Sequence, residues 1–127
     1  MIHTCKYYES SKKYLVAYSK QFGSNGFVTA DSCFVTITKE GNILNSTAPR
    51  PERYDGFDEK LLNGIDFKKM QEFVFEQVCG EKYEAYELED NIWLKKQEDG
   101  GFHLALPVVI QKENDVIISE ELTYPLD

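Results

Sequence analysis

Four carboxylates lie close together between residues 84 and 90, with no basic residue among them: Glu84, Glu87, Glu89 and Asp90. Paired carboxylates can act as general acid and base, but a glycosidase needs two of them in opposed environments at a fixed separation. A calcium loop needs alternating oxygen ligands around a central glycine. Neither pattern is present, so the simplest interpretation of these residues is a solvated polar face.

The aromatic residues in and next to this acidic stretch favour a second interpretation, a protein-binding surface. Tyrosine and tryptophan are preferred anchors at interfaces, and carboxylates add orientation and a fast encounter with a cationic partner. On this hypothesis the partner-binding residues are Glu84, Tyr86, Glu87, Glu89, Asp90 and Trp93.

Arg50 and Arg53 are the only arginines in a chain that otherwise uses lysine. Arginine recognises carboxylate or phosphate groups in a planar, bidentate way. With Tyr54, these two residues predict an alternative site for a small anionic ligand or nucleotide, which an oligomer interface could complete. The competing interpretation is a loop that is pinned to the chain's own acidic half through Glu52 or Asp55.

The cysteine and histidine residues do not form a recognisable metal or nucleophile motif. The three cysteines contain no closely spaced pair of the kind that structural zinc sites use. Cys33 is expected in mid-strand, where a thiol is usually buried and inert. An enzyme that uses His103 with a carboxylate stays open as a third hypothesis, and it requires His103 to line a pocket. No cofactor or metal is expected, and the pattern favours a non-catalytic role.

Charge is divided unequally along the 127 residues. Residues 1–50 carry a net charge of +3, whereas residues 51–127 carry eight basic and nineteen acidic residues, a net charge of −11. The total of −8 disfavours direct binding of nucleic acid and favours a basic protein partner. The odd cysteine count and the lack of a long apolar segment lead us to expect a cytoplasmic protein that does not enter a membrane.

Alternating and turn-forming residues predict strands on both sides of one helix. The expected strands are Lys13–Lys20, Cys33–Thr38, Ile43–Asn45, Tyr83–Glu89, Ile92–Lys96, Phe102–Gln111 and Val116–Leu122. Residues 46–64 hold two prolines and both arginines and are expected to form a long loop. Pro107 cannot donate to a ladder, so we expect an edge or a bulge there.

The helix is predicted over residues 66–79. Asp66 suits the N-cap, and Phe67, Met70, Phe73, Val74 and Val78 follow helical spacing. The fold class is therefore α+β in a single domain, 1–127: an antiparallel β-meander, one main helix and a second antiparallel β-meander. Two apolar sheet faces in so short a chain are compatible with a homodimer.

The leading hypothesis for function is a small acidic, non-catalytic protein-binding domain. It predicts an inhibitor, of the immunity or anti-defence type, that occupies a basic surface of a nucleic-acid-handling partner. This class is inferred by analogy of size and charge alone.

Overall fold

The computed structural model describes residues 2–78 and 85–126, and in these residues eight strands form one sheet. The strands are β1 (Ile2–Tyr8), β2 (Lys13–Phe22), β3 (Val28–Thr38), β4 (Ile43–Ser46), β5 (Ala85–Leu88), β6 (Ile92–Lys96), β7 (Phe102–Gln111) and β8 (Ile117–Leu126). The helices are α1 (Phe67–Val78) and the short 3-10 turns η1 (Ser24–Gly26), η2 (Pro51–Arg53), η3 (Glu59–Leu62) and η4 (Glu113–Asp115).

Strands β1 to β4 pair in chain order, each antiparallel to the next, and are called the arm below. The turn between β3 and β4 consists of residues 39–42, between the predicted strands Cys33–Thr38 and Ile43–Asn45. Its backbone is closed by hydrogen bonds from Thr38 to Asn42 (2.8 Å) and from Gly41 to Thr38 (2.9 Å). Gly41 has a φ of 95°, a conformation that glycine adopts without strain.

Strand β7 is the centre of the second half of the sheet. It pairs along its whole length with β8, whereas β6 and β5 share its other edge. Strand β6 also pairs with β3 in parallel, through Val28 with Ile92 and Thr29 with Trp93. The expected α+β class is observed. The expectation of two separate, purely antiparallel meanders is corrected, because this parallel contact joins both halves and β5 pairs with β7 instead of β6.

Of the two positions expected for Pro107, an edge or a bulge, the edge is wrong, because β7 has neighbours on both sides. It lies where the partner strand changes from β6, which ends opposite Ala105, to β5, which begins opposite Val108. Its carbonyl accepts a hydrogen bond from the backbone of Glu89 (2.9 Å). The N–H that proline lacks would point to the same side of β7 as this carbonyl. Its absence therefore falls between the end of β6 and the start of β5, where neither strand pairs with Pro107.

The hydrophobic core lies between α1 and one face of β6, β7 and β8. Asp66 caps the helix as predicted, since its Oδ1 accepts a hydrogen bond from the backbone nitrogen of Lys69 (2.8 Å). The fully buried side chains are Val28, Met70, Val74, Val78, Ile92, Leu104, Leu106, Val108 and Ile110. The alternate residues Leu104, Leu106, Val108 and Ile110 thus form the face of β7 that lines the core.

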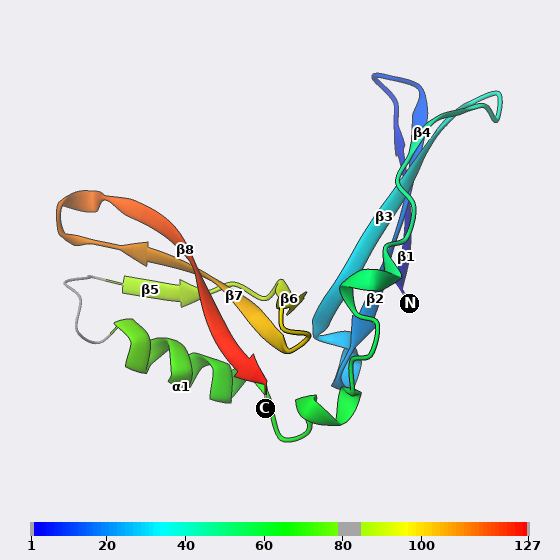
Figure 1. The fold of residues 1–127 in the computed structure, drawn as a ribbon. Helices are drawn as coiled ribbons and strands as arrows, with labels where there is room; N and C mark the ends of the chain where they lie inside the picture. The colour runs from blue at the N-terminus through cyan, green and yellow to red at the C-terminus, as the bar shows by residue number, and fades with distance from the viewer. Residues whose placement is uncertain (1, 79–84, 127) are drawn as a thin grey trace.

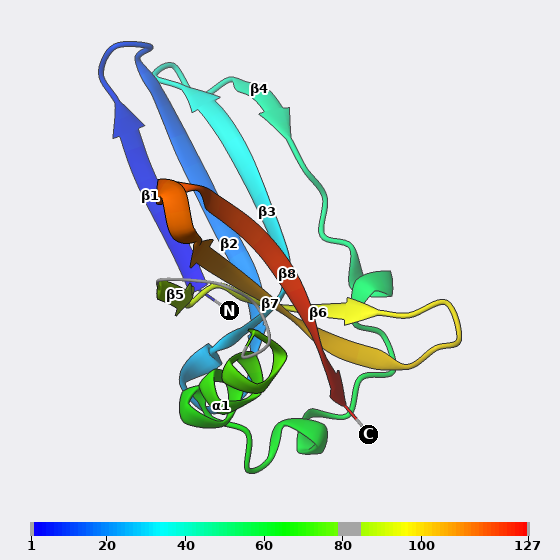
Figure 2. The same cartoon turned by 90° about the vertical axis from the view of Figure 1, so that its left-hand side faces the viewer.

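The sheet is sharply bent where β3 meets β6. In Figure 1 the arm rises away from β7 and β8, and α1 lies beneath the second half of the sheet. Figure 2 shows the same helix at the lower end of the molecule, far from the tips of β1 to β4. Consequently α1 covers the second half of the sheet and leaves most of the arm without a helix over it.

Candidate functional site

Three of the predicted acidic residues lie together in one groove beside the start of α1. Glu87, Glu89 and Asp90 line a cavity of about 520 Å³, and Phe67 and Gln71 of the helix line its other side. Leu88 completes it and is buried. This acidic groove, defined by Phe67, Gln71 and residues 87–90, brings the β5–β6 connection and the helix N-terminus together.

The carboxylates of the groove are held on a fixed backbone but have no cation of their own. Glu89 donates its backbone N–H to Pro107, and the carbonyl of Asp90 accepts one from Ile92 (3.1 Å). Among residues 2–78 and 85–126, the only side-chain ion pairs join Arg53 to Asp31 and Lys95 to Glu121. The groove therefore concentrates negative charge that no lysine or arginine of the described chain neutralises.

Phe67 is the groove residue whose burial was predicted wrongly from the sequence. Helical spacing assigned it to the core, yet it is 41% exposed. It is the first residue of α1, directly after the Asp66 cap, and the buried positions of the helix begin one turn later, at Met70. An apolar side chain next to an N-cap was the available signal.

The remaining residues of the predicted acidic patch lie elsewhere. Tyr86 is half-buried, and its ring faces Phe75 of the helix at a centroid distance of 6.5 Å. Trp93 is also half-buried but lines a different cavity. Glu84 is outside the described residues. Of the six predicted partner-binding residues, the structure thus brings together three, Glu87, Glu89 and Asp90.

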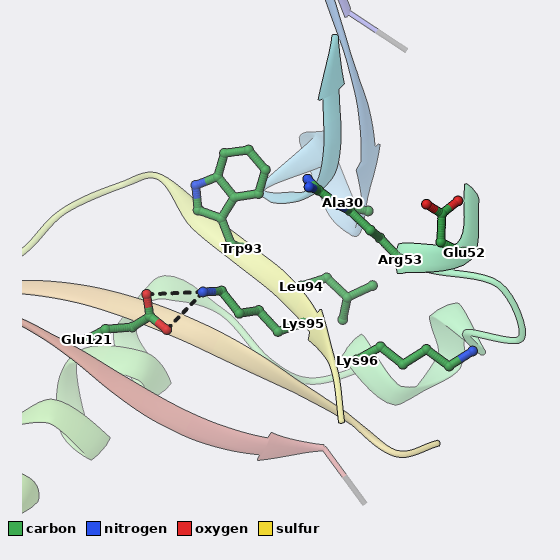
Figure 3. A pocket seen from close by; sticks show the side chains of 8 residues that line it. All are labelled: Ala30, Glu52, Arg53, Trp93, Leu94, Lys95, Lys96 and Glu121. Carbon is green, nitrogen blue, oxygen red and sulfur yellow. Dashed lines mark hydrogen bonds and ion pairs between the residues drawn. The ribbon is translucent and has the colours of Figure 1, made fainter. Parts of the chain in front are cut away.

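The cavity at Trp93 combines an aromatic ring with several charges. It has a volume of about 630 Å³ and lies where β6 leaves β3. Its lining consists of Ala30, Glu52, Arg53, Trp93, Leu94, Lys95, Lys96 and Glu121. Figure 3 shows Arg53 reaching from η2 toward Trp93, while Lys95 is held by Glu121. We call this the tryptophan cavity.

The three cations of the tryptophan cavity are anchored to different degrees. Lys95 lies 3.1 Å from Glu121, with both side chains about half exposed. Lys96 donates to the carbonyl of Asp55 (3.0 Å). Arg53 is 46% exposed, and its nearest carboxylate oxygen, on Asp31, is 3.9 Å away. Arg53 is therefore the least tightly bound of the three and the best placed to reach a ligand.

Of the predicted anion-binding residues, only Arg53 lines this cavity. Arg50 is exposed, and its backbone nitrogen donates to Asp31 Oδ2 (2.6 Å). Tyr54 is half-buried against Phe22, with ring centroids 5.8 Å apart. The loop is held by a carboxylate of the same chain, but this is Asp31 in the basic first part and not Glu52 or Asp55 of the acidic half, as the competing interpretation expected.

Asp31 is the only buried charged side chain in the described residues, with 3% exposure. Its Oδ1 accepts a hydrogen bond from the backbone nitrogen of Ser32 (2.9 Å), while Oδ2 accepts the one from Arg50. A buried carboxylate is tolerated when backbone donors satisfy it. Asp31 is the only acidic residue of β3, whose other polar residues are serine and threonine, and this was the sequence signal for the anchor.

Tyr18 lies on β2 opposite Cys33 of β3, near the same anchor. A side-chain hydrogen bond with Cys33 is the main cause that raises the pKa of Tyr18 above its usual value, followed by partial burial. The negative charge of Asp31 adds to this shift in pKa. Tyr18 is thus held in its protonated form.

His103 lies on β7 opposite Lys95 and Pro125, half-buried. Its Nδ1 is 3.3 Å from the amide nitrogen of Gln97, and no carboxylate in the described residues pairs with its ring. Within the same residues, no three side chains of His, Cys, Asp or Glu gather closely enough to hold a metal ion. No described helix is long and apolar enough to cross a membrane.

The acidic groove and the tryptophan cavity are described from the geometry of this chain alone. No known protein family matches the chain, and neither a curated protein nor a solved structure shows significant similarity to it.

Proposed function

We propose that this protein is a small, acidic, non-catalytic binding domain that inhibits a basic partner. The partner would be a nucleic-acid-handling protein whose cationic surface the domain occupies, as immunity and anti-defence proteins do. The net charge of −8, and of −11 over residues 51–127, supports a cationic partner. The class of inhibitor rests on the analogy of size and charge.

The observation that carries the proposal is the acidic groove with its unpaired carboxylates and exposed ring. Glu87, Glu89 and Asp90 can accept hydrogen bonds from lysine or arginine without first breaking an ion pair of their own. Phe67 offers an apolar surface that a partner can remove from water, as interface anchors do. Charge at the groove's rim is expected to act mainly on the association rate.

The test compares two variants with the same net charge. In the first, Glu87, Glu89 and Asp90 are changed to lysine; in the second, the exposed residues Glu72, Glu98 and Glu113 are changed to lysine. Tagged protein is used to retain partners from its host's extract at about 0.1 M and 1 M salt, since salt screens exposed charge pairs. The captured protein is then assayed for its action on nucleic acid.

We expect wild type and the second variant to retain one basic protein at low salt and to inhibit it. The first variant should lose both properties. If both variants bind equally well, the groove is not the binding surface. If both lose binding equally, net charge alone drives capture and the proposed site is wrong.

The tryptophan cavity favours a second candidate function, the binding of a small anionic ligand with a planar ring. Trp93 offers a stacking surface, and Arg53 a guanidinium whose contact with Asp31 is long, at 3.9 Å. A nucleoside phosphate has both complementary parts, a base and an anion. This candidate retains Arg53 from the predicted loop site and replaces Arg50 and Tyr54 with Trp93, Lys95 and Lys96.

Trp93 is the chain's only tryptophan, so its fluorescence reports directly on this cavity. ATP, adenosine and inorganic phosphate are titrated separately, with the melting temperature as a second readout. We expect ATP to quench Trp93 and raise the melting temperature in wild type and in Arg50→Ala. Arg53→Ala should lose both effects. Unchanged fluorescence and melting temperature with all three compounds would remove this candidate.

A further inference from the structure

The arm exposes apolar surface that a stable sheet normally covers. Apart from Val28, Ala30, Asp31 and Cys33 of β3, none of its described side chains in β1 to β4 is buried. Tyr7 and Tyr14 are 41% and 37% exposed. A sheet gains its stability by packing an apolar face against another layer, and the described residues place no such layer over the distal arm.

The pairing register divides the arm into two unlike faces. Directly opposed residues point to the same side of a sheet. One side therefore carries the rows Cys5–Val16–Val35 and Tyr7–Tyr14–Ile37. The rings of Tyr7 and Tyr14 are in contact, with centroids 4.7 Å apart, which agrees with this assignment. We call these six residues the apolar arm face.

The opposite side of the same strands is charged. Its rows are Thr4–Ala17–Phe34, Lys6–Leu15–Thr36 and Tyr8–Lys13–Thr38, so this side is mixed, and both lysines point away from the apolar arm face. Lys6 and Lys13 thus lie on the mixed side alone, and an uncharged side opposite a charged one is typical of a sheet with one buried face. In Figure 1, α1 lies under the second half of the sheet, and no other layer stands over the upper part of the arm.

The surface area of the whole chain is larger than a compact monomer of its mass should expose. The structure exposes 8650 Å². A compact monomer of 14.7 kDa is expected to expose about 6,900 Å², so the excess is about 1,700 Å². A standard interface removes about 800 Å² from each partner, and permanent homodimers remove more. The excess is therefore large enough for a stable dimer.

We propose that a second copy of this chain covers the apolar arm face. The two arms pack face to face across a twofold axis, as the sheets of a β-sandwich do at a separation of about 10 Å. A twofold axis places the same patch on itself, so the patch must be self-complementary. An uncharged face meets this condition, because no charge is buried unpaired and Lys6 and Lys13 remain in water.

Neighbouring positions on β2 provide a matched test. Val16 lies on the apolar arm face and Leu15 on the other side, and both are half-buried in the single chain. Val16→Lys and Leu15→Lys therefore add the same charge to the same strand. Molar mass is measured by light scattering and sedimentation over a wide range of protein concentration, with circular dichroism as the check on folding.

We expect wild type and Leu15→Lys to have twice the chain mass of 14.7 kDa, and folded Val16→Lys to have the single mass. Cys5 gives a readout that needs no variant, because it is exposed in one chain and lies on the apolar arm face. Its reaction with a maleimide, located by peptide mass spectrometry, should accelerate when wild type is diluted below the dimer range.

A wild type that stays monomeric at all concentrations, with a constant Cys5 rate, overturns the proposal and leaves a different protein as the cover. Dissociation by Leu15→Lys but not by Val16→Lys overturns the assignment of the face. The proposed binding role of the acidic groove is independent of all these outcomes, since the groove residues lie in α1 and the β5–β6 region.

Discussion

Replacing Asp31 should detach the loop that carries both arginines from the sheet. Asp31→Ala removes the acceptor for the backbone N–H groups of Ser32 and Arg50. A hydrogen bond to a charged group contributes about 1.5–3 kcal/mol. Ser32 is exposed and can turn its N–H to water, so its share is discounted. We therefore expect Asp31→Ala to lower the free energy of unfolding by about 2–4 kcal/mol.

Arg53→Ala should lower the free energy of unfolding far less than Asp31→Ala, although it removes the ion-pair partner of Asp31. Losing one partner of a buried pair is severe when the remaining charge is left uncompensated. Here Asp31 keeps two backbone donors, and the Arg53 side chain is 46% exposed at a distance of 3.9 Å. Ion pairs of this kind contribute about 0–1 kcal/mol, so the expected cost is below about 1 kcal/mol.

Asp31→Asn removes the negative charge of the side chain and keeps its size and shape, so it tests the charge apart from the shape. The amide keeps one acceptor oxygen, whereas the carboxylate serves two N–H donors. One of these donors then faces an NH₂ group, so the cost should approach that of Asp31→Ala. The Arg50→Ala variant, which keeps its backbone N–H, is the control and should be close to neutral.

The assay is urea unfolding at one fixed protein concentration, together with hydrogen exchange at the Arg50 amide. That amide should be protected in wild type and in Arg53→Ala and should exchange freely in Asp31→Ala. If Arg53→Ala destabilises the protein as much as Asp31→Ala does, the guanidinium holds the loop and the reasoning from backbone donors is refuted. A small effect of Arg53→Ala would also make that variant a clean probe of the tryptophan cavity.

Two further predictions concern the core and the pH dependence of stability. Leu106→Ala should cost about 2–5 kcal/mol in urea unfolding, because Leu106 is fully buried in β7; Val109→Ala, half-buried on the other face of β7, should cost clearly less. The raised pKa of Tyr18 means that the folded state holds this proton more tightly than the unfolded chain does, so its contribution to stability is present below pH 10 and declines as the pH rises through the folded pKa. Tyr18→Phe should therefore reduce the loss in urea midpoint between pH 9 and pH 11; an identical loss in both proteins would contradict the role of Tyr18.

The elements with strong local signals could be predicted from the sequence. Strands β6 and β7 have the predicted bounds, since their alternation is regular and Glu98–Gly101 separates them with turn-forming residues. Helix α1 begins directly after the predicted Asp66 cap. In these segments the local pattern and the final partner require the same conformation.

Strand β1 and the parallel pairing of β3 with β6 could not be predicted, because both depend on a partner strand and not on the local sequence. Residues 2–8 mix polar and aromatic types, and they are extended because β2 supplies their hydrogen bonds. The pairing of Thr29 with Trp93 joins positions far apart in the chain. Local residue propensities do not encode a pairing between positions so far apart. The sheet bends at this pairing (Figure 1), so its shape could not be predicted either.

The same distant contacts rearranged the candidate sites. Trp93 is only three residues from Asp90, yet the turn after Asp90 carries it to the junction with β3. There it meets Arg53, which the sequence placed in a separate site. Asp31 accepts a hydrogen bond from the backbone of Arg50 and so holds the arginine loop on β3, which places Arg53 beside Trp93. Sequence spacing alone could not distinguish one mixed site from two.

The acidic groove and the apolar arm face lie on different elements, so both can be occupied at once. A dimer through the arms then presents two acidic grooves to a partner. Two linked grooves bind a repeated basic surface more tightly than one, because the second contact becomes intramolecular. Folded Val16→Lys should therefore keep the affinity of a single groove for one basic site and lose the added affinity for a surface that carries several. Equal binding of wild type and Val16→Lys to such a surface would show that the two grooves of the dimer cannot reach the same partner.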